Sequence, residues 1–313
     1  MTVPCAGLVH DLRHQLGEGV TWCERSQSLY WTDIEGSALY CDRLDGRAPH
    51  RWPLPERLAN FALCEDSRYL LLGLASRLAF FELATATLTA LVDVEPGLST
   101  RLNDGRCDRE GRFVFGTMDE APQHQPIGSF YRLNRDLSLE RLPLPQVQIP
   151  NSIAFAPEGG LMYYCDTLSR TLQCCDYSRD GAISHHRQFA VLTDDDGFPD
   201  GSTIDAQGGL WNAQWGGRRV VRYGPDGRET ARVEVPTAQP SCVAFGGAQL
   251  DTLYITTARA ELAAQALRDD PHAGGVFGVQ LAARGLAEPR FGGDPSAVPH
   301  AHRATGQSIR MTD

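Results

Sequence analysis

The sequence predicts an all-β fold: a six-bladed β-propeller in which each blade is a four-stranded antiparallel sheet. Strand-like runs begin at intervals of 41, 43, 49, 48 and 43 residues, which is the length of one propeller blade. A tight turn precedes each run, and a small polar or acidic residue opens a segment ten to thirteen positions before it. The six runs begin at Leu29, Leu70, Phe113, Met162, Leu210 and Leu253.

The second and third strands of the predicted blades are recognised by their composition. The second strand follows the turn and is rich in aromatic and β-branched residues, which favour strands. The third strand follows across a loop, and turns such as Asp45-Gly46 lead from it to a fourth strand. The second strands include Ser28–Asp33, Arg112–Thr117, Leu161–Asp166, Gly209–Gln214 and Thr252–Thr257, and the third strands include Ala38–Cys41, Arg77–Phe81, Gly128–Leu133, Val220–Tyr223 and Gly275–Val279.

The two ends of the chain complete this pattern in different ways. The N-terminal segment Gly7–Arg13 precedes the first polar opening, and we expect it to close the ring as the outer strand of the sixth blade. Residues 1–293 are therefore predicted to be a single propeller domain. The stretch Ala260–Asp269 predicts a short helix or lid in the sixth blade. Residues 294–313 have few apolar side chains and predict a flexible tail.

Charge and composition exclude several classes of function. The net charge of −10 over 313 residues argues against a nucleic-acid or anionic-membrane partner. All 29 basic residues are arginines, which excludes Schiff-base chemistry, pyridoxal phosphate attachment and a P-loop lysine. No secretory signal or membrane-spanning run is found, and nine cysteines without CxxC spacing indicate reduced thiols. We expect a cytoplasmic protein that binds a small molecule, with its oligomeric state left open.

The polar residues that open the blades share one phase of the repeat. In a ring of blades, residues of equal phase lie at equal height and equal distance from the axis, so their side chains can converge. Glu18, Asn151 and Asp200 are hard oxygen donors that suit a divalent cation, whether calcium, magnesium, manganese, iron or zinc. Each alone is typical of a turn, but independent turns have no reason to share a phase. The openings at Asn60 and Pro240–Cys242 receive no assigned chemistry.

The third blade opens differently, with Arg101 and Asn103 two residues apart. Alternation along a strand places both side chains on one face. A guanidinium and an amide that face a polar channel suit a polyhydroxylated ligand. The alternative is that Arg101 pairs with Asp104 in a structural ion pair. The polar loop over Met118–Pro126 is expected to cover the mouth of the channel.

Short motifs are distributed in order over about residues 8–280, which is nearly the whole chain. They are Leu16–Gly19, Arg101–Gly105, Gly116–Met118, Asn151-Ser152, Pro199–Gly201, Trp211 with Gly216-Gly217, Cys242 with Phe245–Gly247, and Gly274–Phe277. Together they resemble the SMP-30/gluconolactonase/regucalcin family of sugar lactonases. The resemblance implies a six-bladed propeller, one divalent cation at one end of the channel, and hydrolysis of a sugar lactone to its aldonic acid.

The resemblance also implies roles for individual residues. Glu18, Asn151 and Asp200 match the family's metal ligands, and Asp200 also matches its proposed acid–base residue. Arg101 and Asn103 match the family's substrate-binding pair.

A further acidic residue of the family binds substrate from the loop after the Gly-Thr-Met motif. Glu120 is the best match to it and Asp119 the second. The Ala121-Pro122 step leaves no carboxylate at the next position.

In the expected reaction the cation polarises the lactone carbonyl, while Asp200 takes a proton from the attacking water and returns one to the ring oxygen. A metal-bound hydroxide is the alternative nucleophile, because a nearby dication makes a carboxylate a poor base. The competing functions are a phosphotriesterase-like hydrolase and a calcium-binding protein without activity. A serine esterase is disfavoured because no G-x-S-x-G motif occurs. The expected substrate is a 1,4- or 1,5-lactone of a pentonic or hexonic acid, consumed in sugar catabolism.

Overall fold

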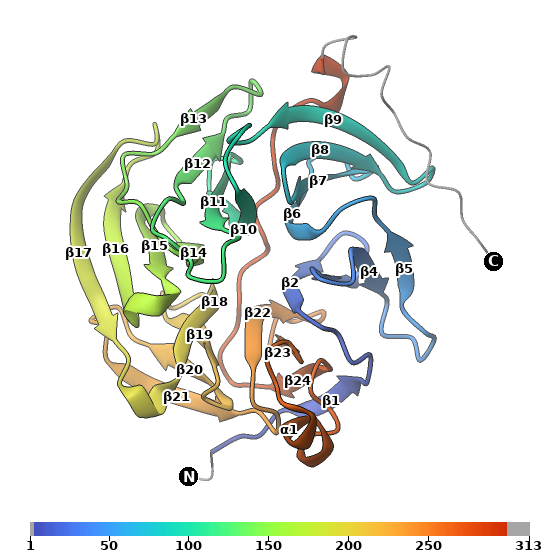
Figure 1. Cartoon of the computed structure of the whole chain (residues 1–313), viewed down its shortest axis with the longest axis vertical. Coiled ribbons are helices and arrows are strands. Elements are labelled where there is room, and N and C mark those ends of the chain that lie inside the picture. Colours follow the sequence, from blue (N-terminus) through green and yellow to red (C-terminus); the bar gives the residue numbers. More distant parts are fainter. Residues whose placement is uncertain (1–2, 299–313) are drawn as a thin grey trace.

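The strand-like runs pair into six four-stranded antiparallel sheets around a central axis, which confirms the predicted six-bladed propeller (Figure 1). The computed structural model describes residues 3–298. From the inner to the outer strand, blade one contains β2 (Gly17–Cys23), β3 (Ser28–Asp33), β4 (Ala38–Asp42) and β5 (His50–Pro53); blade two contains β6 (Leu58–Leu63), β7 (Tyr69–Leu74), β8 (Arg77–Glu82) and β9 (Thr87–Asp93); and blade three contains β10 (Thr100–Cys107), β11 (Phe113–Asp119), β12 (Phe130–Leu133) and β13 (Leu139–Arg141).

The second half of the ring repeats this order, and its last blade takes its outer strand from the start of the chain. Blade four contains β14 (Pro150–Phe155), β15 (Gly160–Asp166), β16 (Thr171–Tyr177) and β17 (Ile183–Val191); blade five contains β18 (Phe198–Ile204), β19 (Leu210–Trp215), β20 (Arg219–Tyr223) and β21 (Glu229–Glu234); and blade six contains β22 (Pro240–Gly246), β23 (Thr252–Thr257), β24 (Val276–Gln280) and β1 (Gly7–His10). Because β1 pairs with β24, the N-terminal strand closes the ring as the outer strand of the sixth blade.

Six apolar clusters hold the ring together, one between each pair of neighbouring blades among residues 3–298. Between blades one and two, for example, Phe61 packs with Trp52 and Leu72. Burial of apolar surface contributes roughly 25 cal/mol per Å². The inner strands are therefore fixed relative to one another, and whatever side chains they turn toward the axis are held on a rigid frame.

Every inner strand has a register shift at or beside the polar residue that opens its blade. In β2 the shift follows Glu18, in β14 it follows Asn151, and in β18 it spans Asp200. The inner strands β6, β10 and β22 have equivalent shifts. Such bulges bend a strand and redirect a side chain. The shared phase of the sequence therefore corresponds to a repeated bulge.

A segment that the repeat did not predict crosses the far end of the channel. After β24 the chain runs over residues 284–293, here called the strap, and passes across the middle of the ring (Figure 1). Ala206 N donates to Arg284 O at one end, and Phe291 N donates to Leu63 O at the other. Phe291 is fully buried between blades two and three. The strap thereby links blade five to blade two.

The remaining elements are short. The helix α1 (Ala264–Asp269) lies between β23 and β24, and the 3-10 helices η1 (Thr167–Ser169) and η2 (Asp194–Asp196) lie in loops. Of the predicted tail, residues 294–298 include η3 (Pro295–Ala297) and the buried Val298, and residues 299–313 lie outside the described residues. No helix within residues 3–298 is long and apolar enough to span a membrane.

All nine cysteines lie in the described part of the chain, and none forms a disulfide. Seven of them are buried, and the other two, Cys5 and Cys41, are exposed and partly exposed.

Candidate active site

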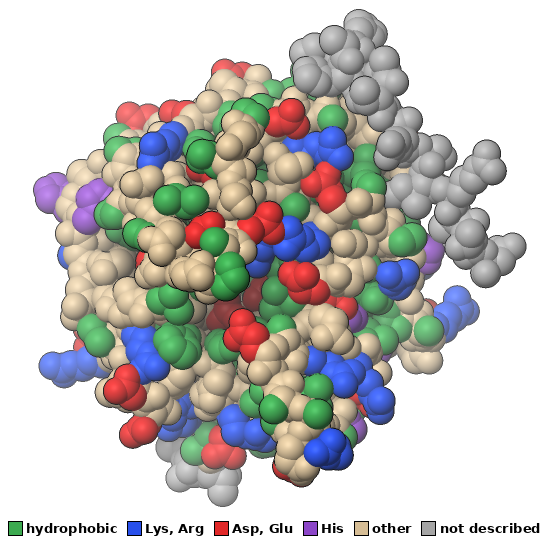
Figure 2. All heavy atoms as spheres, viewed as in Figure 1, with side chains coloured by type: hydrophobic (Ala, Val, Ile, Leu, Met, Phe, Trp, Pro, Cys, Tyr) green, Lys and Arg blue, Asp and Glu red, His purple; other side chains and the backbone are tan. Residues whose placement is uncertain are grey.

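One cavity of about 590 Å³ opens where the inner strands begin. Figure 2 shows its mouth near the centre of the face, with acidic side chains around and inside it. It contains the side chains of all six residues that the sequence singled out, which are Glu18, Arg101, Asn103, Glu120, Asn151 and Asp200. Residues more than 180 positions apart in the chain therefore meet at one place.

Two carboxylates, the partly buried Glu18 on β2 and the buried Asp200 on β18, lie close enough to repel each other. Burial, together with the charges of Glu18 and Asp104, raises the pKa of Asp200 well above its usual value. Burial likewise raises the pKa of Glu18 to about 8, although Glu18 Oε2 accepts a hydrogen bond of 2.9 Å from Gly19 N. Gly19 has a φ of +60°, a conformation that disfavours other residues. Neither carboxylate forms an ion pair with any described arginine or histidine.

Asn103 and Asn151 are linked to each other and to their surroundings by hydrogen bonds. Asn103 Nδ2 donates to Asn151 Oδ1 at 3.3 Å and to Pro150 O at 2.9 Å. Asn151 Nδ2 donates to Thr167 Oγ1 at 2.8 Å. These bonds fix the orientation of both amides before any ligand binds, as a preorganised site requires.

Arg101 packs against Asn103 rather than against Asp104. Its Nη1 donates to Asn103 Oδ1 and to Leu102 O, both at 2.8 Å. No ion pair joins Arg101 to Asp104 among the residues the structure describes, so that structural alternative is wrong. Burial and the nearby Arg57 lower the pKa of Arg101 to about 10. The guanidinium remains charged at neutral pH and faces the cavity.

The donor set of the cavity suits a divalent cation. Two carboxylates and a carboxamide offer hard oxygen atoms, and a buried pair of like charges without a counter-ion is costly unless a cation binds between them. Within residues 3–298 no group of three or more histidine, cysteine, aspartate or glutamate side chains could hold a metal. The candidate site therefore depends on Asn151 as its third protein ligand, which leaves coordination positions for water or substrate.

Asp104 is a third carboxylate near this pair that the sequence reasoning did not assign to the site. Its Oδ2 accepts a hydrogen bond of 2.7 Å from Ile153 N, and its charge raises the pKa of both Glu18 and Asp200. The bulge between Leu102 and Gly105 turns Asp104 inward directly after Asn103. Strict alternation of side chains along β10 would place Asp104 on the face opposite Asn103, so the sequence did not point to it.

The backbone around Asp200 is held by hydroxyl and amide groups from two blades. Ser152 Oγ donates to Asp200 O at 2.6 Å, and Asn212 Nδ2 donates to the same oxygen at 2.9 Å. Ser202 Oγ completes the group by hydrogen bonds with Ser152 and Asn212. The sequence offered one signal for this group, since Ser152 belongs to the Asn-Ser motif.

The strands that carry Glu18 and Asn151 are entered through matching aspartate clamps. Asp33, at the end of β3, accepts from the amides of the residues three and two positions before Glu18, at 3.3 and 3.0 Å. Asp166, at the end of β15, accepts from the amides three and two positions before Asn151, at 3.0 and 3.2 Å. Both aspartates close the second-strand runs of the sequence repeat, and that shared position was the signal for them.

The loop at the mouth separates the roles of two neighbouring carboxylates. Asp119 accepts hydrogen bonds from Ala121 N and Gln125 N, at 3.0 and 2.7 Å, and these bonds hold its pKa below the usual value. Asp119 therefore shapes the loop. Glu120 lines the cavity and forms an ion pair with Arg57.

Two of the phased openings serve the channel wall. Asn60 Nδ2 donates to Asn103 O, and Ser241 Oγ donates to Gly17 O. Both side chains are buried and support neighbouring inner strands.

Known proteins with similar sequences cover nearly the whole chain. Residues 16–259 match the family described as SMP-30/Gluconolactonase/LRE-like region. An L-arabinolactonase from Azospirillum brasilense is 58% identical over 291 residues, which cover 93% of this chain and 96% of the relative. A pentonolactonase from Haloferax volcanii is 33% identical over 287 residues, which cover 90% and 96%.

A solved structure supports the same relationship. The calcium-binding protein regucalcin from Agrobacterium tumefaciens matches with a TM-score of 0.88 at 31% identity, over 93% of this chain and 99% of that one. The resemblance found in the sequence motifs is thereby confirmed, and this chain belongs to the SMP-30/gluconolactonase/LRE-like family.

Proposed function

We propose that this protein is a carboxylic ester hydrolase that opens a sugar lactone to its aldonic acid with the help of one divalent cation. The observation that carries the proposal is the cavity itself, where two carboxylates that form no ion pair with a described residue and a carboxamide lie beside a guanidinium that suits a hydroxylated ligand. The identity of 58% to an L-arabinolactonase supports the choice of a lactone.

A divalent cation held by Glu18, Asn151 and Asp200 would act as a Lewis acid toward the lactone carbonyl. The residues of the chain supply the proton transfers. The oxygen of a water molecule attacks the carbonyl carbon while Asp200 takes the proton of that water. As the bond between the carbonyl carbon and the ring oxygen breaks, Asp200 returns a proton to that oxygen, which becomes the hydroxyl group of the open acid.

Arg101, Asn103 and Glu120 are proposed to bind the hydroxyl groups of the sugar. Arg101 donates from a fixed position, because Asn103 and the Leu102 carbonyl already hold its guanidinium. Besides the polar Asn151 and Asp200, blades four and five contribute the apolar side chains of Leu168, Phe198 and Trp215 to the cavity. A sugar lactone has a hydroxylated edge and an apolar ring face, so it matches these two unlike walls.

A lactone of a five-carbon acid is the proposed substrate, and L-arabinonolactone is the first compound to test. Both the 58% relative and the 33% relative are named for pentonic substrates, and this supports the choice over hexonolactones. The acid released would enter sugar catabolism.

The test is release of acid, followed with a pH indicator, from purified protein stripped of metal with a chelator. Calcium, magnesium, manganese, iron and zinc are added back singly, against a panel of 1,4- and 1,5-lactones and one phosphotriester, with spontaneous hydrolysis subtracted. We expect metal-dependent opening of L-arabinonolactone. The proposal is abandoned if every metal-loaded sample leaves all the lactones at the spontaneous rate, or if the phosphotriester is the better substrate.

A further inference from the structure

Three charged residues from three different blades form a bridge at the mouth of the cavity. Arg57, just before β6, forms an ion pair with Glu120, which follows β11. Its Nη1 also lies 3.6 Å from Oε1 of Glu35, in the turn between β3 and β4. All three side chains line the cavity and remain partly exposed, at 30% for Arg57, 34% for Glu120 and 43% for Glu35.

The bridge neutralises the polar wall of the mouth. That wall carries two positive groups, Arg57 and Arg101, and two negative groups, Glu35 and Glu120, so their charges cancel. Deeper in the cavity the charges of Glu18 and Asp200 would be cancelled by a bound dication. A substrate without charge therefore meets a polar wall and a metal site whose charges balance, with Glu261 at the rim as a further negative group.

An additional anionic group on the substrate would have no favourable place in this mouth. Arg57 is already occupied on both sides by Glu35 and Glu120, so an incoming phosphate or carboxylate would meet those two carboxylates first. On the facing wall, the side chains of Leu168, Phe198 and Trp215 cannot pair with a charge. The guanidinium of Arg170, which stacks on the ring of Phe198, is already paired with Asp194. The exposed Glu261 at the rim adds a further negative charge.

The backbone keeps the bridge at the rim. Arg57 O accepts a hydrogen bond of 2.8 Å from Ala75 N, and Glu120 N donates to Ser99 O at 3.0 Å. Asp119 fixes the loop that follows Glu120 through its two amide bonds. The backbone positions from which Arg57 and Glu120 meet at the rim are therefore set by the fold.

We infer that the Glu35–Arg57–Glu120 bridge determines substrate specificity: it masks Arg57 and restricts the site to lactones that carry no anionic substituent. This inference rests on the proposed lactonase function and names the substrate class of that same site. It assigns to Arg57 and Glu35 a role that lies outside the metal site and the Arg101–Asn103 pair. Unmasking Arg57 would convert the mouth into a site for an anionic group.

The experiment compares glucono-1,5-lactone with 6-phosphoglucono-1,5-lactone, which differ only in the phosphate, and includes L-arabinonolactone as a second neutral substrate. The variants are Glu35→Gln, Glu120→Gln, the double variant, and the double variant with Arg57→Gln added. Glu56→Gln is the matched control, because Glu56 neighbours Arg57 in sequence but pairs with Arg77 outside the cavity. Thermal unfolding and metal titration verify that each variant is folded and binds its cation.

For the wild type we expect a low kcat/KM on the phosphorylated lactone that rises with ionic strength, because salt screens the repulsion. In the double variant the ratio of kcat/KM values, phosphorylated over neutral, should rise about tenfold or more. Adding Arg57→Gln should abolish that gain, and Glu56→Gln should leave the ratio at the wild-type value.

The outcomes separate this inference from the proposed function. If the wild type opens neutral lactones but the double variant keeps the wild-type ratio, the inference is wrong and the function stands. A gain that survives Arg57→Gln also overturns the inference, because Arg57 would then not be the group that receives the anion. If no protein in the series opens any lactone, the proposed function itself fails.

Discussion

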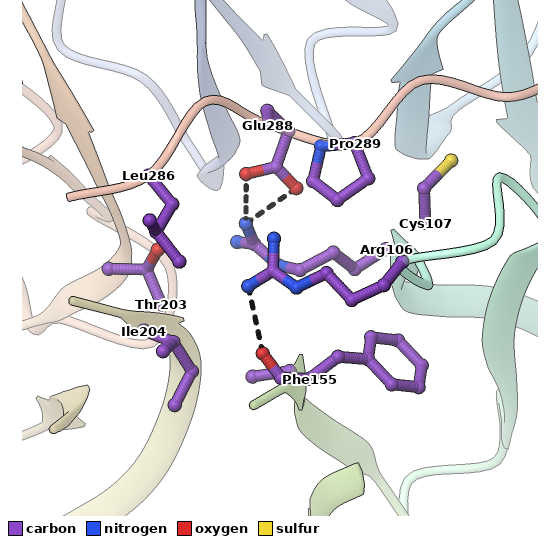
Figure 3. A pocket seen from close by; sticks show the side chains of 10 residues that line it. Arg106, Cys107, Phe155, Thr203, Ile204, Leu286, Glu288 and Pro289 are labelled. Atoms are coloured by element: carbon purple, nitrogen blue, oxygen red, sulfur yellow. Dashed lines mark hydrogen bonds and ion pairs between the residues drawn. The ribbon is translucent and has the colours of Figure 1, made fainter. Parts of the chain in front are cut away.

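The two ends of the channel treat buried charge in opposite ways. At the strap end, Arg106 on β10 donates two hydrogen bonds of 2.8 and 2.7 Å to Glu288 (Figure 3). Its Nη2 donates to Ser202 O. At the cavity end, Glu18 and Asp200 lie together without an ion pair among residues 3–298. The compensated pair stabilises the fold, whereas the uncompensated pair is unfavourable until a cation binds. The difference teaches which charges are structural and which are functional.

The largest expected effect is on turnover at the uncompensated end. Asp200→Asn should lower kcat by at least about 10³-fold, because the amide cannot accept the proton of the attacking water. The measurement is lactone hydrolysis at saturating metal, with metal affinity determined separately. Asp226→Asn is the matched control, because Asp226 lies in a second Pro-Asp-Gly turn and is exposed. Near-full turnover by a metal-loaded Asp200→Asn protein would remove the acid–base role.

The second prediction breaks the compensated pair. Glu288→Gln should lower the free energy of unfolding by about 3 kcal/mol, because it leaves Arg106 largely buried without its counter-charge. Urea unfolding of the metal-free protein measures this change, and Glu110→Gln, at an exposed glutamate near the strap, serves as the control. A loss no larger than that of the control would show that the strap end does not depend on this pair.

The third prediction reverses the sign at the cavity end. In metal-free protein, Asp200→Asn should raise the free energy of unfolding by about 2 kcal/mol, because it removes a buried carboxylate that the neighbouring Glu18 repels. Saturation with the cation should reverse the order, so that the wild type becomes the more stable protein. Destabilisation of the metal-free variant would mean that the carboxylate supports the fold after all.

The smallest effect is expected at the aspartate clamps. Asp166→Asn keeps one acceptor oxygen but loses the charge that strengthens the bonds from the amides before Asn151. We expect about a fivefold weaker metal affinity, which corresponds to about 1 kcal/mol. Calorimetric metal titration measures it, and Asp136→Asn, in an exposed turn, is the control. Unchanged affinity in Asp166→Asn would reduce the clamp to a purely structural feature.

The architecture and the members of the cavity were accessible from the sequence because both follow the repeat. A period of about one blade predicted six sheets, and the shared phase predicted that Glu18, Asn103, Asn151 and Asp200 lie at equal height on the inner strands of four blades. A residue's position in the repeat predicts that its side chain faces the cavity because a bulge recurs at that position in the inner strands.

Features that depend on contacts between distant segments were not accessible. Arg57 meets Glu120 across 63 positions, and Glu288 meets Arg106 across 182, with no periodic pattern in either case. Asp104 was hidden for a different reason, because the bulge in β10 breaks the alternation that placed Arg101 and Asn103 on one face and left Asp104 off it. The strap belongs to no blade, so the repeat contained no signal for it.

The strap also determines how molecules travel to and from the site. The two spaces that the strap shares with the inner strands are about 10 and 20 Å³, enough for single water molecules but not for a sugar. Within the described part of the chain the cavity is therefore a dead end, and the substrate enters and the product leaves by the same opening. The proposed substrate is neutral and its product is an anion. Because Arg57 and Arg101 balance Glu35 and Glu120, the charge of Glu261 at that opening favours departure of the acid over its return. The strap at the far end therefore makes substrate and product share one opening, and the negative charge at that opening favours release of the acid over its rebinding.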